Sequence, residues 1–256
     1  MTGAKLYVIG VGPGGERDIT GAALAAIDSC SDFFGYAPYL DRLQLRADQV
    51  RHASDNREEM SRAQAALTMA VQGARVGVVS GGDAGVFGMA AAICEAIETG
   101  PSQWRNLHVE VIPGVTAMLA VAARTGAPLG HDFCAISLSD NLKPWDVIAL
   151  RLRAAATAGF VIALYNPVSK ARPWQLTEAF RILGECLPAS TPVIFGRAAG
   201  RSDERLSTVH LGAAHSGMAD MATCVIVGSS QTRVIARDAM APLVYSPRSL
   251  SGFDRP

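Results

Sequence analysis

The sequence predicts an α/β protein of two domains, and three observations support this. Short apolar runs alternate with helix-like stretches along almost the whole chain, which is typical of βαβ units and a mostly parallel sheet. The 256 residues suffice for two domains of ordinary size. Residues 125–130 (Thr-Gly-Ala-Pro-Leu-Gly) interrupt the alternation with two glycines and a proline. We therefore expect an N-terminal α/β domain over residues 1–124 and a C-terminal α/β domain over residues 131–256.

In the first domain, strands are expected where buried apolar runs occur and helices where alanines or apolar residues recur at helical spacing. The expected strands are Leu6–Val11, Asp32–Gly35, Arg75–Ser80 and His108–Ile112. The expected helices are Ile19–Ser29, Arg57–Gln72, Gly88–Glu98 and Val115–Arg124. Each strand is thus followed by a helix or by a turn rich in glycine.

The second domain repeats this alternation less regularly. Its expected strands are Phe133–Leu138, Phe160–Tyr165, Val193–Phe195 and Thr223–Gly228. Its expected helices are Trp145–Thr157 and Trp174–Cys186, which separate only some of the strands.

The composition argues against several classes of protein. Lys plus Arg and Asp plus Glu both number 23, so no basic excess is present to neutralise a nucleic-acid backbone. The five cysteines include no C-x-x-C pair and the five histidines no H-E-x-x-H motif, so neither a disulfide framework nor a bound metal is expected. No run approaches the ~20 apolar residues that cross a bilayer, and no signal-peptide pattern opens the sequence. We expect a cytoplasmic protein that binds neither nucleic acid nor membrane.

A glycine-rich loop follows the first strand and admits two interpretations. Gly10-Val11-Gly12-Pro13-Gly14-Gly15 satisfies the G-x-G-x-x-G pattern, in which glycines seat a pyrophosphate on a helix N-terminus. A dinucleotide site also needs an acid at the end of the second strand, whereas Asp32 stands at the beginning of that strand. Pro13 also lacks the amide donor that a phosphate cradle would use. The two departures disfavour an NAD site, and a tight turn without a ligand is the alternative.

Two further turns follow later strands of the first domain. Ser80–Gly88 contains four glycines, which let a ligand lie against the backbone. Its single charge, Asp83, favours a cationic or hydroxyl-rich ligand, and the alternative role for Asp83 is the N-cap of the following helix. Ile112–Ala117 places Thr116 at the next strand end. Thr116 is expected either to contact a ligand or to bond the amides of its own helix.

In this order, the three turns resemble those of the tetrapyrrole (corrin and sirohaem) methyltransferases, a family that uses S-adenosylmethionine. Later segments resemble the branch of that family acting on precorrin-3B at C-17. These segments are His131–Asp140, Lys143-Pro144-Trp145, Leu164–Lys170 with its Asn-Pro pair, and Thr223–Arg233 with its Ser-Gln-Thr-Arg. The resemblance covers about residues 5–235.

The resemblance implies two α/β domains with the active site in the cleft between them, and a homodimer. It also implies S-adenosylmethionine as the methyl donor. The cationic ammonium and sulfonium groups of this donor, which has no phosphate, suit a loop whose only charge is Asp83. Carried over position by position, the cofactor contacts are Pro13, Gly81, Gly82, Asp83, Val86, Thr116 and Ala117 in the first domain and Tyr165, Asn166, Arg197, Ala198, Ala199, Thr223 and Val225 in the second.

The implied substrate is a tetrapyrrole edged with acetate and propionate groups. The first loop is then free for the substrate, and the amides of Gly12 and Gly14 at a helix N-terminus are expected to bind these anions. Arg17, Arg57 and Arg197 are expected to form charge-assisted pairs with other carboxylates. For each arginine the alternative is an ordinary surface charge.

The implied reaction is methylation of C-17 with contraction of the macrocycle, which gives precorrin-4. Methyl transfer is an in-line displacement favoured by alignment, and contraction from a tertiary alcohol and a lactone calls for an acid–base group. Asp18, Tyr36 and Glu58 are the candidates, with a helix cap, a core aromatic and a solvated helix charge as their respective alternatives. Relatives that methylate uroporphyrinogen carry an acid after the tyrosine of the second strand, where this sequence has Ala37.

Three other functions remain as alternatives. The nearest is C-17 methylation of cobalt-factor III, the cobalt-containing counterpart of the anaerobic route. No cysteine cluster follows residue 235, which favours the metal-free substrate. A non-catalytic tetrapyrrole carrier would not need the Asp83 and Thr116 turns, and an NAD-dependent oxidoreductase would bind NAD instead of S-adenosylhomocysteine.

Overall fold

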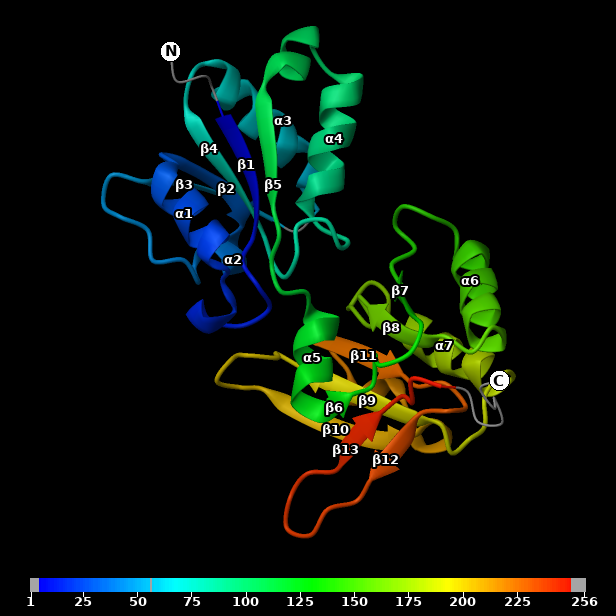
Figure 1. The fold of residues 1–256 in the computed structure, drawn as a ribbon. Helices are drawn as coiled ribbons and strands as arrows, with labels where there is room; N and C mark the ends of the chain where they lie inside the picture. Colours follow the sequence, from blue (N-terminus) through cyan, green and yellow to red (C-terminus); the bar gives the residue numbers. More distant parts are fainter. Residues whose placement is uncertain (1–4, 56, 250–256) are drawn as a thin grey trace, which may run out of the picture. The chain divides into compact units, whose positions relative to one another are not determined.

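The structure is a computed structural model that describes residues 5–55 and 57–249. The chain divides into two units, Met1–Ala117 and Met118–Pro256, each with its own five-stranded sheet (Figure 1). The boundary expected after residue 124 therefore falls at the first residue of helix α5 (Ala117–Thr125), so nearly all of this helix belongs to the second unit. The reason is packing, because a Cβ on Gly196 would collide with the Val121 side chain of α5. This helix is thus seated on the sheet of the second unit.

The first unit contains a five-stranded sheet in the order β3-β2-β4-β1-β5. Every neighbouring pair is parallel, so the carboxyl ends of all five strands lie at one edge, which we call the carboxyl edge. The strands are β1 (Lys5–Gly10), β2 (Asp32–Tyr36), β3 (Val50–Ser54), β4 (Arg75–Ser80) and β5 (His108–Ile112). The exposed edge strand β3 was not expected, since its sequence Val-Arg-His-Ala-Ser has few apolar residues.

Helices cover both faces of this sheet, as Figure 1 shows. Alternate residues of a strand point to opposite faces, so Leu6 and Val8 of β1 join one core while Tyr7 and Ile9 join the other. The first core is closed by α3 (Glu59–Val71), α4 (Met89–Thr99) and the 3-10 turn Ser102–Asn106. The second is closed by α1 (Gly21–Ser29) and α2 (Ala37–Leu40).

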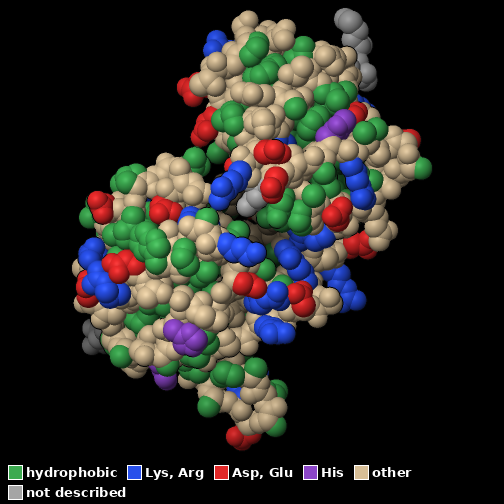
Figure 2. Space-filling model, turned by 180° about the vertical axis from the view of Figure 1, so that it is seen from behind, with side chains coloured by type: hydrophobic (Ala, Val, Ile, Leu, Met, Phe, Trp, Pro, Cys, Tyr) green, Lys and Arg blue, Asp and Glu red, His purple; other side chains and the backbone are tan. Residues whose placement is uncertain are grey.

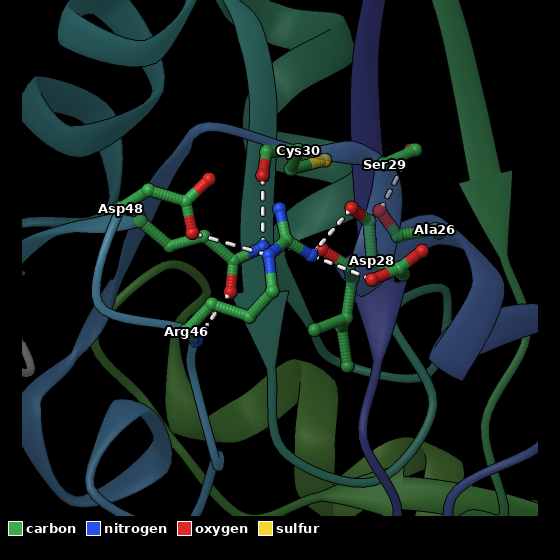
Figure 3. A network of polar contacts seen from close by, with 8 residues as sticks. Ala26, Asp28, Ser29, Cys30, Arg46 and Asp48 are labelled. Atoms are coloured by element: carbon green, nitrogen blue, oxygen red, sulfur yellow. Dashed lines mark hydrogen bonds and ion pairs between the residues drawn. The ribbon is translucent and has the colours of Figure 1, made fainter.

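A polar network fixes the segment that leads from α2 to β3 (Figure 3). The Arg46 guanidinium donates to the carboxylate of Asp28, 2.6 Å away, and to that of Asp48, 3.1 Å away. The buried Gln49 amide donates to the carbonyls of Ile27 and Cys30, each at 2.9 Å. These carbonyls lie at the C-terminal end of α1, where a helix leaves backbone acceptors unsatisfied. The network therefore sets the position at which β3 begins.

The second unit contains a mixed sheet in the order β10-β9-β11-β8-β7. Only β7 and β8 are parallel, and the other neighbouring pairs are antiparallel, so the expectation of a mostly parallel sheet is wrong here. The segments after β9 and β10 contain no α-helix for a parallel crossover, which takes a dozen or more residues. The strands are β7 (Phe133–Ser137), β8 (Val161–Tyr165), β9 (Pro192–Arg197), β10 (Arg205–His210) and β11 (Thr223–Val227).

Helices α6 (Trp145–Thr157) and α7 (Gln175–Gly184) enclose the main core of this unit against one face of the sheet. A small third sheet, in the order β12-β13-β6, joins three short strands. They are β12 (Arg233–Ile235), β13 (Leu243–Tyr245) and β6 (Gly126–Ala127), none of which the sequence pattern indicated.

Acidic and basic side chains are interspersed on the face shown in Figure 2, in keeping with the equal numbers of the two signs. Within residues 5–55 and 57–249, no helix is long and apolar enough to cross a bilayer. Over the same ranges, no cluster of three or more His, Cys, Asp or Glu side chains is arranged to hold a metal ion. The five cysteines are free thiols.

Candidate active site

The three glycine-rich turns expected from the sequence meet at the carboxyl edge of the first unit. The amide of Gly12 donates to the carbonyl of Gly82 at 3.0 Å, and the amide of Gly82 donates back to Gly12 at 2.9 Å. The amide of Val11 also donates to the carbonyl of Ser80 at 3.0 Å. The first two turns are therefore fastened to each other through their backbones.

Close contact between these turns explains two of the glycines. A Cβ on Gly10 would lie 2.7 Å from the amide nitrogen of Gly114 and 2.8 Å from the carbonyl oxygen of Gly82. A Cβ on Gly114 would collide with the same Gly82 oxygen. At these positions the missing side chain admits a neighbouring turn rather than a ligand.

Asp83 joins the second turn to the third. Its Oδ1 accepts from the amide of Gly85 at 2.8 Å, and its Oδ2 accepts from the amide of Gly114 at 2.9 Å. The N-cap position of α4 belongs to Gly88 and has no side-chain cap, so the N-cap interpretation of Asp83 is wrong. The carboxylate holds two turns together, a role that sequence spacing alone did not reveal.

The expected anion cradle in the first turn is contradicted at Gly12. This residue is buried and its amide is taken by Gly82, so it has no donor left for a substrate carboxylate. Gly14 is also buried, and its carbonyl accepts from Arg42 Nη1 at 3.2 Å. The same Arg42 nitrogen bonds the carbonyl of Pro13 at 3.1 Å. Sequence reasoning missed Arg42 because it lies in a segment without a motif.

The helix that was expected to begin at this turn starts later in the chain. A 3-10 turn, Glu16–Asp18, comes first, and α1 then begins at Gly21. Thr20 caps α1, since its Oγ1 accepts from the amide of Ala23 at 3.1 Å, so the cap interpretation of Asp18 is wrong. Backbone atoms of Asp18 pack against Gly12, where a Cβ would lie 2.6 Å from the Asp18 carbonyl oxygen.

Tyr36, at the end of β2, lies at the carboxyl edge and is half-buried. Its ring packs edge-to-face on Tyr39, with the ring centroids 5.3 Å apart. Tyr39 in turn lies beneath the second turn, where a Cβ on Gly81 would be 2.6 Å from the Tyr39 ring. Tyr36 therefore adjoins the glycine turns rather than the interior of either core.

Glu58 lies between β3 and α3, in a segment that we call the β3–α3 turn and define by the described residues Ser54, Asp55, Arg57 and Glu58. It is exposed, and its Oε2 accepts from the amide of Asp55 at 2.9 Å. Arg57 beside it and Arg17 in the first turn are also exposed. The turn follows the carboxyl end of β3 directly, so Glu58 and Arg57 belong to the same edge as Tyr36.

Arg62 is a further residue at this edge that sequence reasoning missed. It belongs to the buried face of α3 and is only 5% exposed. Its Nε donates to Ser54 Oγ at 2.7 Å, its Nη2 to the carbonyl of Asp55 at 2.6 Å, and its Nη1 to the sulfur of Met89 at 3.3 Å. The sequence feature that could have revealed it is an arginine placed among alanines on the apolar side of a predicted helix.

In the second unit, two of the expected residues end strand β8. The hydroxyl of Tyr165 accepts from the amide of Met118 at 3.0 Å, in the first turn of α5. Asn166 has a φ of 53°, the left-handed region that few residues other than glycine adopt. Its Nδ2 donates to Ser137 Oγ at 2.9 Å, and its carbonyl accepts from Arg172 Nη1 at 3.1 Å. Strain held in this way is common at functional sites.

Arg197 forms ion pairs with two neighbouring carboxylates. Its guanidinium is 2.6 Å from the carboxylate of Asp203 and 2.7 Å from that of Asp220, and these hydrogen bonds raise its pKa. Thr223 Oγ1 donates to the other carboxylate oxygen of Asp220 at 2.8 Å. Two carboxylates already balance Arg197, so the expectation that it pairs with substrate is not supported by this geometry.

The remaining expected residues of the second unit are less accessible. Ala198 has a φ of 49°, and both it and Ala199 are buried. Val225 is fully buried in the core, and its strand is paired on both sides, with Leu164 and Phe195 opposite it. The expectation that Val225 contacts a cofactor is therefore wrong.

Asp32, which a dinucleotide site would have needed at the other end of its strand, is engaged elsewhere. It lies at the start of β2, where its Oδ1 is 2.9 Å from His52 Nε2 and its Oδ2 accepts from Ser31 at 2.7 Å. Tyr36, not an acid, ends β2. The first unit consequently lacks the ribose-binding feature of a dinucleotide fold at this strand.

The parallel sheet of the first unit, with three joined turns at its carboxyl edge, defines an α/β protein of the kind that binds small molecules outside the strand ends. Within that class, comparison with known families identifies one family. The chain belongs to the family of tetrapyrrole (corrin/porphyrin) methylases, which it matches over residues 5–214.

Individual relatives agree with this membership. The chain is 64% identical over 252 residues to the precorrin-3B C(17)-methyltransferase of Sinorhizobium sp, which covers 98% of this chain and 99% of that protein. A crystal structure of the methyltransferase CobJ is similar, with a TM-score of 0.90, 46% identity, and coverage of 96% of this chain and 100% of the other. Uroporphyrin-III C-methyl transferase from Thermus thermophilus, complexed with S-adenyl homocysteine, shares the fold, with a TM-score of 0.67, 22% identity, and coverage of 88% and 98%.

Proposed function

We propose that this chain is an S-adenosylmethionine-dependent methyltransferase that methylates precorrin-3B at C-17 and contracts the ring to give precorrin-4. The observation that carries the proposal is the 64% identity, over nearly the full length of both chains, to a protein named for this reaction. The CobJ-like fold supports it independently of that name.

The backbone of the second turn at Gly82 carries no side chain toward the third turn. A Cβ there would make only ordinary van der Waals contacts, the nearest with Thr116 Cα at 3.8 Å, so the two turns adjoin each other at the proposed methyl-donor site. Gly82 has a φ of 70°, so a side chain is strained at this position. The Thermus relative with bound S-adenyl homocysteine supports the same ligand class. When bound, the donor supplies an electrophilic methyl group on a cationic sulfur.

We assign the cofactor role in the first unit to Pro13, Gly81, Gly82, Val86, Thr116 and Ala117, with Asp83 holding the turns in register. In the second unit we assign it to Tyr165, Asn166, the Arg197–Ala199 turn and Thr223. These residues act by orientation, since methyl transfer depends on holding donor and acceptor carbon ~3–3.5 Å apart in line. Asp83 also leaves a negative charge beside the turns, which favours a cationic ligand.

The acid–base step of ring contraction is proposed for Tyr36 ahead of Glu58 and Asp18. Within the part of the chain that the structure describes, the Tyr36 hydroxyl has no hydrogen-bond partner, so it is available to donate or accept a proton. Glu58 already binds the amide of Asp55. We propose that Arg17, Arg57 and the first turn at its exposed Gly15, next to the buried Gly14, receive substrate carboxylates.

The test is direct. Purified protein is incubated with labelled S-adenosylmethionine and precorrin-3B, and in parallel with cobalt-factor III. We expect label to enter the first substrate with formation of precorrin-4. Transfer only to cobalt-factor III would establish the cobalt-dependent counterpart, and transfer to neither would contradict the proposal.

A thermal shift separates the remaining alternatives. S-adenosylhomocysteine at 100 times its dissociation constant should stabilise the fold by ~2.7 kcal/mol, whereas NAD should have no effect. Stabilisation by NAD alone would indicate an oxidoreductase, and a tetrapyrrole carrier would respond to neither. We further propose a cytoplasmic homodimer, which sedimentation of the purified protein would test.

A further inference from the structure

Arg62 is a buried cation whose protein partners are all neutral. Its three hydrogen bonds go to a hydroxyl, a backbone carbonyl and a thioether. Within residues 5–55 and 57–249, no carboxylate lies within ion-pair distance of its guanidinium. Charged side chains as buried as this one are normally paired. The carboxylates of Glu59, Glu58 and Asp55 act on the charge of Arg62 only through space, and none of them forms an ion pair with it.

Two of its N–H groups are unused. A guanidinium has five donors, and the hydrogen bonds to Ser54, Asp55 and Met89 account for three. Burial lowers the pKa of Arg62, yet an arginine keeps its proton in proteins. Two donors on a permanent, poorly solvated cation favour a bidentate acceptor such as a carboxylate.

The position of Arg62 connects it with the proposed substrate site. Ser54 ends β3 at the carboxyl edge, and Asp55 continues into the β3–α3 turn that carries Arg57 and Glu58. Met89 begins α4 directly after the second glycine turn, and its amide donates to Ser80 Oγ at 3.3 Å. The guanidinium thus lies between the β3–α3 turn, which it contacts at Ser54 and Asp55, and the start of α4, which it contacts at Met89.

We propose that Arg62 binds a side-chain carboxylate of the tetrapyrrole substrate through its two unused N–H groups. The inference rests on the proposed function, because it takes the acetate and propionate groups of precorrin-3B as the anion. Because Arg62 is only 5% exposed, the proposal requires the substrate carboxylate to reach the guanidinium from the carboxyl edge, where Ser54 and the β3–α3 turn lie. Arg62 then gains a directly hydrogen-bonded carboxylate partner only when substrate is present.

The test uses steady-state kinetics with precorrin-3B and calorimetry with S-adenosylhomocysteine on the full chain. Arg62→Met removes the charge and Arg62→Lys keeps it without the planar fork. Ser54→Ala removes one tether of the guanidinium and leaves its charge. Arg75→Met is the matched control, since Arg75 begins β4 at the opposite end of the same sheet and is exposed.

We expect KM for precorrin-3B to rise about ten- to hundredfold in Arg62→Met, as for the loss of a hydrogen bond to a charged group. A smaller rise is expected in Arg62→Lys. The affinity for S-adenosylhomocysteine should stay within about twofold of wild type, and Ser54→Ala and Arg75→Met should leave KM within the same range.

Other outcomes have distinct meanings. If the wild-type protein transfers no methyl group to precorrin-3B, the proposed function fails, which is separate from the role of Arg62. If the wild type is active and KM is unchanged in Arg62→Met, or rises equally in Ser54→Ala, Arg62 is only a tether and the inference is overturned. If Arg62→Met does not fold, KM of Arg62→Lys decides, since a severalfold rise supports the inference and wild-type KM overturns it.

Discussion

The carboxylate of Asp83 accepts a hydrogen bond from the amide of Gly114 at 2.9 Å, across 31 positions of sequence. Its other oxygen accepts from Gly85, two residues away. One side chain therefore determines how the turn after β4 meets the turn after β5. The residues proposed to hold the cofactor, Gly82 and Thr116 among them, belong to these same two turns.

This relationship predicts that both the charge at position 83 and the number of hydrogen-bond acceptors there contribute to stability and to cofactor affinity. Asp83→Asn keeps one acceptor oxygen, whereas Asp83→Ala keeps none. Leaving the half-buried Gly114 amide unsatisfied costs about 1–3 kcal/mol, whereas the exposed Gly85 amide can bond water instead. The free energy of unfolding should therefore fall in the order wild type, Asn, Ala. Urea denaturation measures this, and calorimetry should give S-adenosylhomocysteine affinities in the same order. Equal affinities in the two variants would mean that only the charge acts; Asp238→Asn, exposed and distant in sequence, is the control.

Asn166 leads to a second prediction. Two substitutions at this residue distinguish the contribution of its left-handed backbone conformation from that of its side-chain hydrogen bond to Ser137. Asn166→Gly removes the hydrogen bond to Ser137 but adopts a positive φ without strain. Asn166→Ala removes the same hydrogen bond and also tolerates a positive φ less well than Asn does. A non-glycine residue there costs roughly 1–2 kcal/mol. The melting temperature should therefore fall further in the Ala variant than in the Gly variant. The reverse order would show that the conformation is not retained in solution.

Sequence reasoning located the parallel sheet of the first unit well because its apolar runs and glycine turns coincide with strands and strand ends. Arg75–Ser80 and His108–Ile112 were expected with the bounds that the structure has. It missed β3 and β10, whose polar residues suit edge strands, and the three short strands of the small sheet. It located β9 and β11 but not their antiparallel pairing, which depends on contacts between distant segments.

The candidate site was located less completely, for a physical reason. A motif shows which residue types recur at a turn, but not where their hydrogen bonds go. Gly12 and Asp83 were expected to face ligands, and the structure gives both of them backbone partners. Arg42 and Arg62 carry no motif, and only their burial against the turns reveals them.

A third prediction concerns alkaline pH. Burial raises the pKa of the Cys30 thiol to about 11, above its usual value, so the folded state keeps a proton that the unfolded chain loses near pH 9. Stability from this thiol is complete below pH 9 and is lost as pH rises to 11, by about 2–3 kcal/mol. Denaturation of wild type and Cys30→Ala at pH 8 and pH 10.5 should show the two converging at high pH. Parallel pH profiles would refute burial of the thiol as the cause.

A fourth prediction assigns a structural role to part of the Ser-Gln-Thr-Arg segment that carried the resemblance. Thr232 Oγ1 accepts from the amide of Ser229 at 2.9 Å and lies 2.9 Å from Ser246 Oγ, which donates to the carbonyl of Pro128 at 2.6 Å. This buried chain of hydroxyls joins the end of β11 to the segments around β13 and β6. Thr232→Val keeps the shape of the side chain but leaves the Ser229 amide and the Ser246 hydroxyl without this partner.

The cost in Thr232→Val should be about 1–3 kcal/mol for a buried donor left unsatisfied, measured by urea denaturation. KM values and the affinity for S-adenosylhomocysteine should not change below the unfolding transition, because the hydroxyl bonds only protein groups. Thr208→Val serves as the control, since Thr208 is a half-buried residue of β10, away from this chain of hydroxyls. A variant that keeps wild-type stability but loses cofactor affinity would instead place Thr232 in the binding site, so the two measurements together assign this part of the segment to the fold or to the ligand.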